Sequence, residues 1–435
     1  MIDLKVSFHT LGCKVNQFET DAMAALFKQN GYQVVDPCDK TDVFVINSCT
    51  VTAASDKKTR QLVNRYRRLN ANAVLVLAGC YAQLNVENLK NDEKIDIIIG
   101  TKHKGQVVDE VTRFLKSKDH LVSVEGFFPN EPYEDLSIYE THDRTRANIK
   151  IQDGCRQFCA YCIIPFARGP IRSRTVKDIL EEIQRLHNNG YREIVLNGIH
   201  ISSYASEIGD GGLSDLIRSI NALQLNDIRF RLGSLEPMVI SEPLLLAMQQ
   251  GHFCDHFHLS LQSGSDTVLK RMNRHYTTAE YADKVKLIRQ YFPMAGITTD
   301  IITGFPGETD EEFQQTMTFV SQIGFSKVHV FTFSRRQGTK AYNMLHQIDG
   351  MTKKNRTHQL IKLSESLAQI YAKQFINKEL EVLFEKKDGQ HVFAGHATNY
   401  LEVKTNSKID LINQIRVVKV ASQHGGKLIT EEVRQ

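Results

Sequence analysis

Short apolar runs without polar alternation recur in the first part of the chain and indicate strands that are buried on both faces. They predict strands at Val6–Thr10, Asp42–Asn47, Ala73–Ala78 and Ile95–Ile99. An apolar stripe predicts a helix from about Asn16, which together with Glu19 resembles a helix cap, and a basic helix is expected over 55–69. Buried strands that alternate with helices form a parallel sheet covered on both faces.

The same alternation returns after residue 147. Strands are predicted at Asn148–Gln152, Glu193–Leu196, Arg229–Leu232, His256–Leu261, Gly296–Thr303 and Lys327–Phe333. Helices are predicted between them, for example over Val176–Asn188 and Thr278–Tyr291. Six strands with intervening helices predict a partial (β/α)6 barrel, and such barrels carry their sites at the carboxyl ends of the strands.

The pattern changes again towards the carboxyl end. An amphipathic helix over 353–376 precedes short strands that are separated by turn residues, which predicts a small all-β barrel. The α/β chain is therefore expected to contain an amino-terminal domain (1–116), a linker (117–146), a barrel core (147–350), a connecting helix (351–374) and the small barrel (375–435).

Composition narrows the class of protein. The 435 residues are 41% hydrophobic, enough for several cores, and the net charge of +4 permits nucleic-acid binding without arguing for it. Neither a signal peptide nor an apolar run of about 18 residues is visible, so we expect a cytoplasmic protein without a membrane span and with reduced thiols. Its eight cysteines are then metal ligands or buried thiols.

Three cysteines stand close together after the first barrel strand. Cys155, Cys159 and Cys162 form a Cys-x3-Cys-x2-Cys arrangement, with Tyr161 before the third. Three thiolates can hold three corners of a 4Fe–4S cluster and leave one iron open to a small molecule. A zinc site and three packed structural cysteines are the alternatives, but zinc usually finds four ligands.

Three further cysteines each follow a strand of the first domain. Cys13 and Cys80 come after a glycine, and Cys49 follows Asn47-Ser48. Because the carboxyl ends of parallel strands share one edge of a sheet, we expect the three thiols to converge and hold a second cluster. A lone cysteine is more often a small buried hydrophobe, and Cys38 matches no strand end.

Two cysteine triads and a terminal β-barrel resemble the radical SAM methylthiotransferases over essentially the whole chain, where SAM is S-adenosylmethionine and the terminal barrel is the TRAM module. Details resemble the MtaB type, which modifies N6-threonylcarbamoyladenosine in tRNA. The matching stretches are Thr10–Gln17, Asn47–Thr52, Cys162–Gly169, Ile199–Tyr204 and Leu259–Gly264. Relatives that modify isopentenyladenosine usually have Met where this chain has Val15.

The resemblance implies an enzyme that adds a methylthio group to C2 of N6-threonylcarbamoyladenosine 37. It implies two 4Fe–4S clusters, one that cleaves SAM to a 5′-deoxyadenosyl radical and one that delivers sulfur, with a second SAM as the methyl source. It also implies a tRNA anticodon stem-loop as partner, an external electron donor and a sulfur donor. A monomer is expected.

Further contacts are predicted from position in the chain. Residues at strand ends and Tyr161 are candidates for SAM binding, namely Tyr161, Asn197, Gly198, Ser234, Gln262 and Gly304. Arginines that follow the cysteine loop are candidate RNA contacts, namely Arg168, Arg172 and Arg174. The basic helix is a second RNA candidate. His256 and His258 near Cys254 could suggest a metal, although packing is the simpler interpretation.

Two other functions remain open at this point. The chain could be a methylthiotransferase for isopentenyladenosine in tRNA or for a ribosomal protein. It could also be no enzyme but an iron–sulfur protein that binds RNA or senses redox state. The residue that takes the C2 proton is not visible in the sequence.

Overall fold

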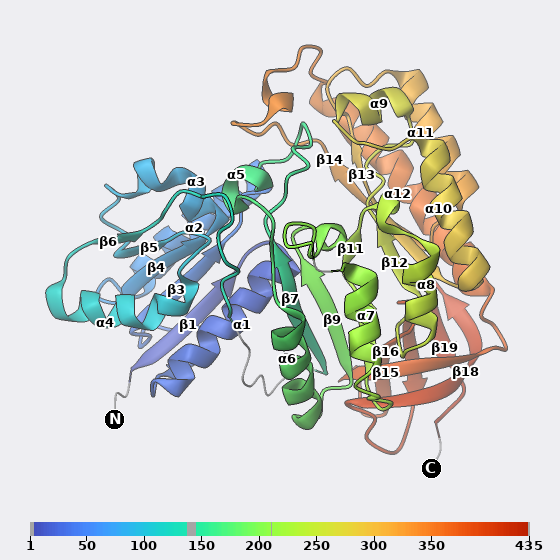
Figure 1. Cartoon of the computed structure of the whole chain (residues 1–435), viewed down its shortest axis with the longest axis horizontal. Helices are drawn as coiled ribbons and strands as arrows, with labels where there is room; N and C mark the ends of the chain where they lie inside the picture. Colours follow the sequence, from blue (N-terminus) through green and yellow to red (C-terminus); the bar gives the residue numbers. More distant parts are fainter. Residues whose placement is uncertain (1–3, 137–144, 210, 434–435) are drawn as a thin grey trace. The chain divides into compact units, whose positions relative to one another are not determined.

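A computed structural model of the chain describes residues 4–136, 145–209 and 211–433 (Figure 1). The described residues form two compact units. The first comprises those within 1–142, 150–182 and 334–342, and the second those within 143–149, 183–333 and 343–435. The first unit therefore contains both the amino-terminal α/β sheet and the loop with Cys155, Cys159 and Cys162.

A parallel sheet forms the centre of the first unit. Its strands are β1 (Lys5–Thr10), β2 (Gln33–Val34), β3 (Val43–Ser48), β4 (Val74–Gly79), β5 (Ile97–Ile99) and β6 (Leu121–Ser123). They are arranged in the order β2-β1-β3-β4-β5-β6, and every neighbouring pair is parallel. The predicted sheet is confirmed. The sequence missed the two short edge strands, of which β6 lies in the expected linker, and residues 137–144 of that linker fall outside the described residues.

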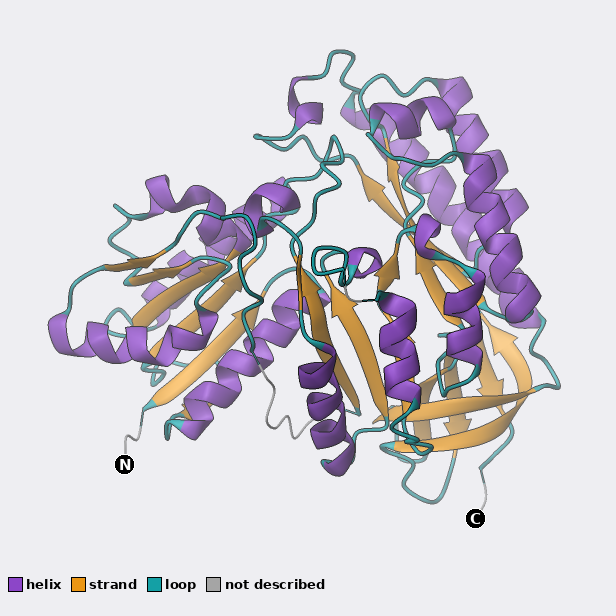
Figure 2. Cartoon of the chain, viewed as in Figure 1, coloured by secondary structure: helices purple, strands orange, loops and turns teal. Residues whose placement is uncertain are grey.

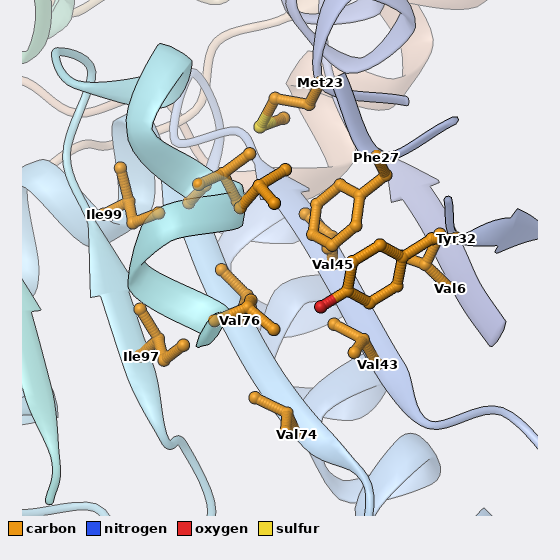
Figure 3. Close-up of a cluster of buried hydrophobic side chains, with 14 of the residues drawn as sticks. Val6, Met23, Phe27, Tyr32, Val43, Val45, Val74, Val76, Ile97 and Ile99 are labelled. Atoms are coloured by element: carbon orange, nitrogen blue, oxygen red, sulfur yellow. The ribbon is translucent and has the colours of Figure 1, made fainter. Parts of the chain in front are cut away.

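Helices cover both faces of this sheet. They are α1 (Lys14–Gln29), α2 (Ala53–Leu69), α3 (Cys80–Leu89) and α4 (Val107–Ser117), with the short 3-10 turn η1 (Lys104–Gln106). Val43 and Val45 of β3 pack with Met23 and Phe27 of α1 on one face (Figure 3). Phe44, the residue between these valines, belongs to the cluster on the other face, which includes residues of α2 and α3. Apolar residues at successive strand positions thus fill two cores, which explains the absence of polar alternation.

The first helix begins earlier than the sequence suggested. Its N-cap is Cys13, so Asn16 and Glu19 lie inside the helix and are buried, and the expected cap at Asn16 is wrong. The helix therefore begins directly at a candidate cluster ligand. The two side chains have other partners, described below.

The barrel strands form two ladders. They are β7 (Arg146–Asp153), β8 (Arg172–Ser173), β9 (Glu193–Gly198), β10 (Arg229–Leu232), β11 (Ser234–Leu235), β12 (His256–Leu259), β13 (Gly296–Thr303) and β14 (Lys327–Thr332). One sheet has the order β10-β9-β7-β8 and the other β11-β12-β13-β14. Only Gly233 separates β10 from β11, so one stretch of chain passes from the first ladder to the second. This arrangement agrees with the predicted open barrel, to which the structure adds β8 and β11.

Helices separate most of these strands. They are α5 (Ile164–Arg168), α6 (Val176–Asn188), α7 (Leu213–Asn221), α8 (Glu242–Gln249), α9 (Asp266–Arg271), α10 (Thr278–Tyr291), α11 (Asp310–Ile323) and α12 (Gly350–Lys373), with the 3-10 turns η2 (Ile201–Ser203), η3 (Pro237–Val239) and η4 (Lys340–Asn343). Thr309 and Glu312 form a capping box at the start of α11. None of the described helices combines the length and apolar character that a bilayer crossing requires.

The chain ends in the predicted small β-barrel (Figure 2). Its strands are β15 (Glu379–Lys387), β16 (Val392–Ala397), β17 (Glu402–Asn406), β18 (Gln414–His424) and β19 (Lys427–Thr430). They close in the order β15-β16-β17-β19-β18, an architecture consistent with a TRAM-like module. The sequence analysis did not identify β19.

Cys254 and the nearby histidines have structural partners in the second unit. Cys254 is buried, with its Sγ 4.0 Å from Oε2 of Glu193. His256 and His258 both contact the Thr298 hydroxyl, at 3.0 and 2.9 Å. These contacts favour the packing interpretation over a metal site.

Candidate functional site: two cysteine triads in one unit

The first triad lies at the carboxyl edge of the amino-terminal sheet. Cys13 follows β1, Cys49 directly follows β3, and Cys80 begins α3 directly after β4. Gly12 has a φ of +106°, and a Cβ there would lie 2.7 Å from the Cys49 Cβ. Gly79 has a φ of +98°, and a Cβ there would lie 2.6 Å from the Ser48 carbonyl oxygen. Only glycine allows these approaches, which draw the three cysteine-bearing loops together.

Two thiols of this triad, Cys49 and Cys80, have raised pKa values. Burial raises the pKa of the Cys49 thiol, and Cys13 shifts it in the same direction. Burial raises the pKa of the Cys80 thiol to about 11, with Cys13 again adding to the rise while Arg168 and Lys104 oppose it. Cys13 is exposed, whereas Cys49 and Cys80 are buried. Cys13 therefore lies near enough to act on both of the other thiols, and the cluster that the three would hold stays a prediction.

The second triad lies on a loop that the backbone holds at both ends. Gln152 Nε2 donates to the carbonyl oxygens of Asp153 and Gly154, each at 2.7 Å, and the Cys155 N–H donates to the Gly169 carbonyl oxygen at 3.1 Å. Gly154 has a φ of +76°, and a Cβ there would lie 1.8 Å from the Pro170 carbonyl oxygen. The loop is therefore closed against the segment that follows α5.

The three arginines after this loop do not form an exposed surface. Arg168, Arg172 and Arg174 are 0%, 5% and 1% exposed. Arg172 Nη2 donates to the Arg168 carbonyl oxygen at 3.0 Å, and Arg174 pairs with Glu182. Their burial contradicts the prediction of phosphate contacts, because each guanidinium is already enclosed by protein partners.

Arg168 belongs instead to a buried network of charges that the sequence analysis missed. Arg168 and Lys104 pair with the Glu19 carboxylate, and Lys150 Nζ lies 3.1 Å from the Asp153 carboxylate. Although burial alone would raise it, the surrounding cations lower the pKa of Glu19 to about 2. Glu19 lies three or four residues from apolar residues of α1 and therefore falls on the apolar face of that helix. A charged residue on an apolar face is the sequence signal that could have revealed the network.

The strand-end candidates for SAM binding lie in the second unit, apart from Tyr161, which is half-buried in the first. Asn197 and Gly198 end β9, Ser234 begins β11, and Gln262 and Gly304 follow β12 and β13. The backbone N–H groups of two of them already have partners. The Gln262 N–H donates to the Asp300 carbonyl oxygen at 2.8 Å, and the Gly304 N–H donates to Glu308 Oε2 at 2.6 Å. Ser234 is exposed, and the buried Asn197 donates to Asn148 Oδ1 at 2.7 Å.

Each triad offers three thiols to a metal centre. In the part of the chain that the structure describes, no three His, Cys, Asp or Glu side chains are close enough together to hold one metal ion. A cube-shaped cluster binds each thiolate through a different iron, so its ligands stand further apart than those of one ion. The three thiols of each triad are one fewer than the four that normally complete such a cluster.

Two parts of the chain match known protein families. Residues 149–320 match the Radical SAM superfamily, and residues 5–100 match the uncharacterized protein family UPF0004. The structure of TsrM from Kitasatospora setae, a radical S-adenosylmethionine methyltransferase, has a similar fold at 14% identity, with a TM-score of 0.56 and coverage of 76% of this chain and 75% of that one.

Sequence relatives span nearly the whole chain. The threonylcarbamoyladenosine tRNA methylthiotransferase MtaB of Bacillus subtilis (strain 168) is 39% identical over 420 residues, which cover 95% of this chain and 93% of the relative. The protein of the same name from Thermotoga maritima is 36% identical, with coverage of 96% and 95%. The tRNA-2-methylthio-N(6)-dimethylallyladenosine synthase of Syntrophus aciditrophicus is 32% identical, with coverage of 98% and 95%. The chain therefore belongs to the radical SAM tRNA methylthiotransferases, and within them to the MtaB type.

Proposed function

We propose that this protein adds a methylthio group to C2 of N6-threonylcarbamoyladenosine 37 in tRNA, using two 4Fe–4S clusters. The observation that carries the proposal is that Cys13, Cys49 and Cys80 follow three neighbouring parallel strands at one sheet edge, in the same unit as the Cys155 loop. An enzyme that only cleaves SAM has no need of the first triad. A second set of three thiolates supports a reaction that also delivers sulfur.

The two proposed clusters have different roles. When bound, the cluster on Cys155, Cys159 and Cys162 supplies the electron that cleaves SAM, and the cluster on Cys13, Cys49 and Cys80 supplies the sulfur. Radical chemistry suits the target, because C2 of adenine is an unactivated aromatic C–H that acid–base catalysis does not reach. The protein itself fixes the loops: Gln152 and Gly154 close the Cys155 loop, while Gly12 and Gly79 permit the close approach of the other three.

The threonylcarbamoyl substrate is favoured by the relatives. Those named threonylcarbamoyladenosine tRNA methylthiotransferase are 34–39% identical to this chain, and those named tRNA-2-methylthio-N(6)-dimethylallyladenosine synthase are 31–33% identical. The difference is consistent across both groups but small. Substrate identity therefore requires a direct test.

Deleting the gene should remove 2-methylthio-N6-threonylcarbamoyladenosine from the tRNA of the host and leave the unmodified N6-threonylcarbamoyladenosine in its place. Mass spectrometry of nucleosides from digested tRNA measures both. Methylthio-isopentenyladenosine serves as the internal control and should not change. Loss of that nucleoside alone would reject the proposed substrate in favour of the isopentenyladenosine reaction.

With the three arginines buried, we propose that α2 makes the phosphate contacts. Lys57, Lys58, Arg60, Arg65 and Arg68 on this helix are exposed. Arg67 differs from them because it pairs with Asp96 at 2.7 Å. Exposed cations along one helix provide the kind of local basic surface that RNA binding uses.

Alanine at Lys57, Lys58 and Arg60 together should weaken binding of an anticodon stem-loop and make that binding less dependent on salt. The plot of log affinity against log salt should become shallower by about 0.7–0.9 for each phosphate that the helix no longer neutralises. Fluorescence anisotropy at several salt concentrations measures both effects. Lys28→Ala, at the exposed end of α1, is the matched control and should leave affinity and slope unchanged. An unaltered slope in the triple variant would exclude α2 from the RNA surface.

A further inference from the structure

Arg168 connects the two cysteine triads through its side chain. It is the last residue of α5, in the segment that follows Cys162, and its neighbour Gly169 accepts the Cys155 N–H. Its fully buried side chain reaches the other triad, where Nε donates to Cys80 Sγ at 3.3 Å. A residue that follows the proposed SAM-cleaving loop thus touches the sulfur of one cysteine of the first triad.

Asn16 extends this contact to the other two cysteines. Arg168 Nη2 donates to Asn16 Oδ1 at 2.7 Å, and the Cys13 thiol lies 3.7 Å from the same oxygen. Asn16 Nδ2 donates to the carbonyl oxygens of Leu11 at 2.8 Å and Ser48 at 3.0 Å, which lie just before Cys13 and Cys49 in sequence. Through Asn16, the backbone just before Cys13 and Cys49 is therefore connected to the Arg168 guanidinium, which itself contacts the Cys80 sulfur.

The charges around Arg168 do not cancel. Arg168, Lys104 and Lys150 are three buried cations, and Glu19 and Asp153 are two buried carboxylates. Arg172 also lies near Asp153 but pairs with Glu131, so one net positive charge remains beside Cys80. Charges in such an enclosed place are screened little by salt. A positive charge and an N–H donor at a ligand sulfur both stabilise the reduced cluster, which carries the more negative charge, and so raise its reduction potential.

We propose that Arg168 is a positioning residue that raises the reduction potential of the cluster on Cys13, Cys49 and Cys80 relative to that on the neighbouring loop. The inference rests on the proposed function, because it requires a cluster on the first triad. According to this inference, residues of the chain itself give the two clusters different reduction potentials. If Arg168 acted only as a structural ion pair, its substitution would lower the iron content or the stability of the protein. It would not shift the midpoint potential according to the sign of the charge removed.

The test uses full-length protein in which Cys155, Cys159 and Cys162 are alanine, so that only the first triad can hold iron. After anaerobic reconstitution, a redox titration followed by electron paramagnetic resonance gives the midpoint potential. Arg168→Gln should shift the midpoint to a more negative value, because it removes the charge. Arg168→Lys should recover part of the shift, because it restores the charge without the guanidinium geometry. Glu19→Gln should shift the midpoint the opposite way, since it removes a nearby negative charge.

A second set of variants, in which only the Cys155 loop can hold iron, separates an effect on the first cluster from a general effect of the substitution on both clusters. With Cys13, Cys49 and Cys80 replaced by alanine instead, Arg168→Gln should change the midpoint of the remaining cluster less. An unchanged midpoint in the first background, equal shifts in both backgrounds, or shifts of the same sign for Arg168→Gln and Glu19→Gln would overturn the inference. If Arg168→Gln fails to bind iron, the Arg168→Lys and Glu19→Gln titrations still decide it. Absence of iron from the first background itself would reject the two-cluster proposal, which is a different result.

Discussion

Replacing Cys155 by alanine is expected to reduce 5′-deoxyadenosine formation to the level seen without protein. Cys155, Cys159 and Cys162 are the thiols of the loop within the Radical SAM match, and each supplies one of only three protein ligands to the proposed cluster. Losing one of three leaves too few ligands for a stable cluster. Anaerobic incubation with SAM and a strong reductant, followed by mass spectrometry of 5′-deoxyadenosine, measures the loss.

Cys38→Ala is the matched control for this experiment. Cys38 is also a partly buried thiol of the first unit, but it lies in the loop between β2 and β3, where its Sγ contacts Thr41 Oγ1 at 3.6 Å. This variant should form 5′-deoxyadenosine at the parent rate. Full activity in Cys155→Ala, or equal loss in both variants, would contradict the assignment of the loop.

Replacing Cys49 by alanine is expected to abolish methylthio transfer while SAM cleavage continues. The variant should keep about four irons per chain, because the Cys155 loop has its own backbone anchors at Gln152 and Gly169. It should form 5′-deoxyadenosine and no methylthiolated nucleoside from an anticodon stem-loop substrate. Iron quantitation and nucleoside mass spectrometry on the same preparation measure the two results.

Other outcomes would contradict this role for the first triad. Methylthio transfer in Cys49→Ala at the parent level would show that the sulfur does not depend on the first triad. Loss of SAM cleavage together with transfer would mean that the two sites cannot be separated by this substitution, and the division of labour between them would be wrong. A parent protein that never cleaves SAM would favour the iron–sulfur RNA-binding alternative.

The repeated patterns of the chain could be predicted from its sequence. The central strands of the first sheet and the helices Val176–Asn188 and Thr278–Tyr291 were found because buried strands and amphipathic helices have characteristic spacings. The edge strands β2 and β6 were missed because each has only two or three residues, too few for a period to show. The position of Cys13, Cys49 and Cys80 at one sheet edge was predictable because parallel topology brings strand ends to one edge.

The roles of individual charged residues could not be predicted in the same way. Arg168, Arg172 and Arg174 resemble a basic patch in sequence, yet their partners include residues far away along the chain. Arg168 meets Glu19, which is 149 residues away in sequence. A charge that is neutralised by such a distant residue looks the same in sequence as one exposed to solvent. Glu19 was likewise mistaken for part of a helix cap, because its buried partners come from later segments.

Iron and acid-labile sulfide per chain, measured in the intact protein after anaerobic reconstitution, test the central claim most directly. The account predicts about eight irons and eight sulfides, from two clusters of four. A matched preparation of Cys49→Ala should contain about half as much of each. An intact protein that saturates at about four irons would contradict the two-cluster account, because one of the two cysteine triads would then hold no cluster.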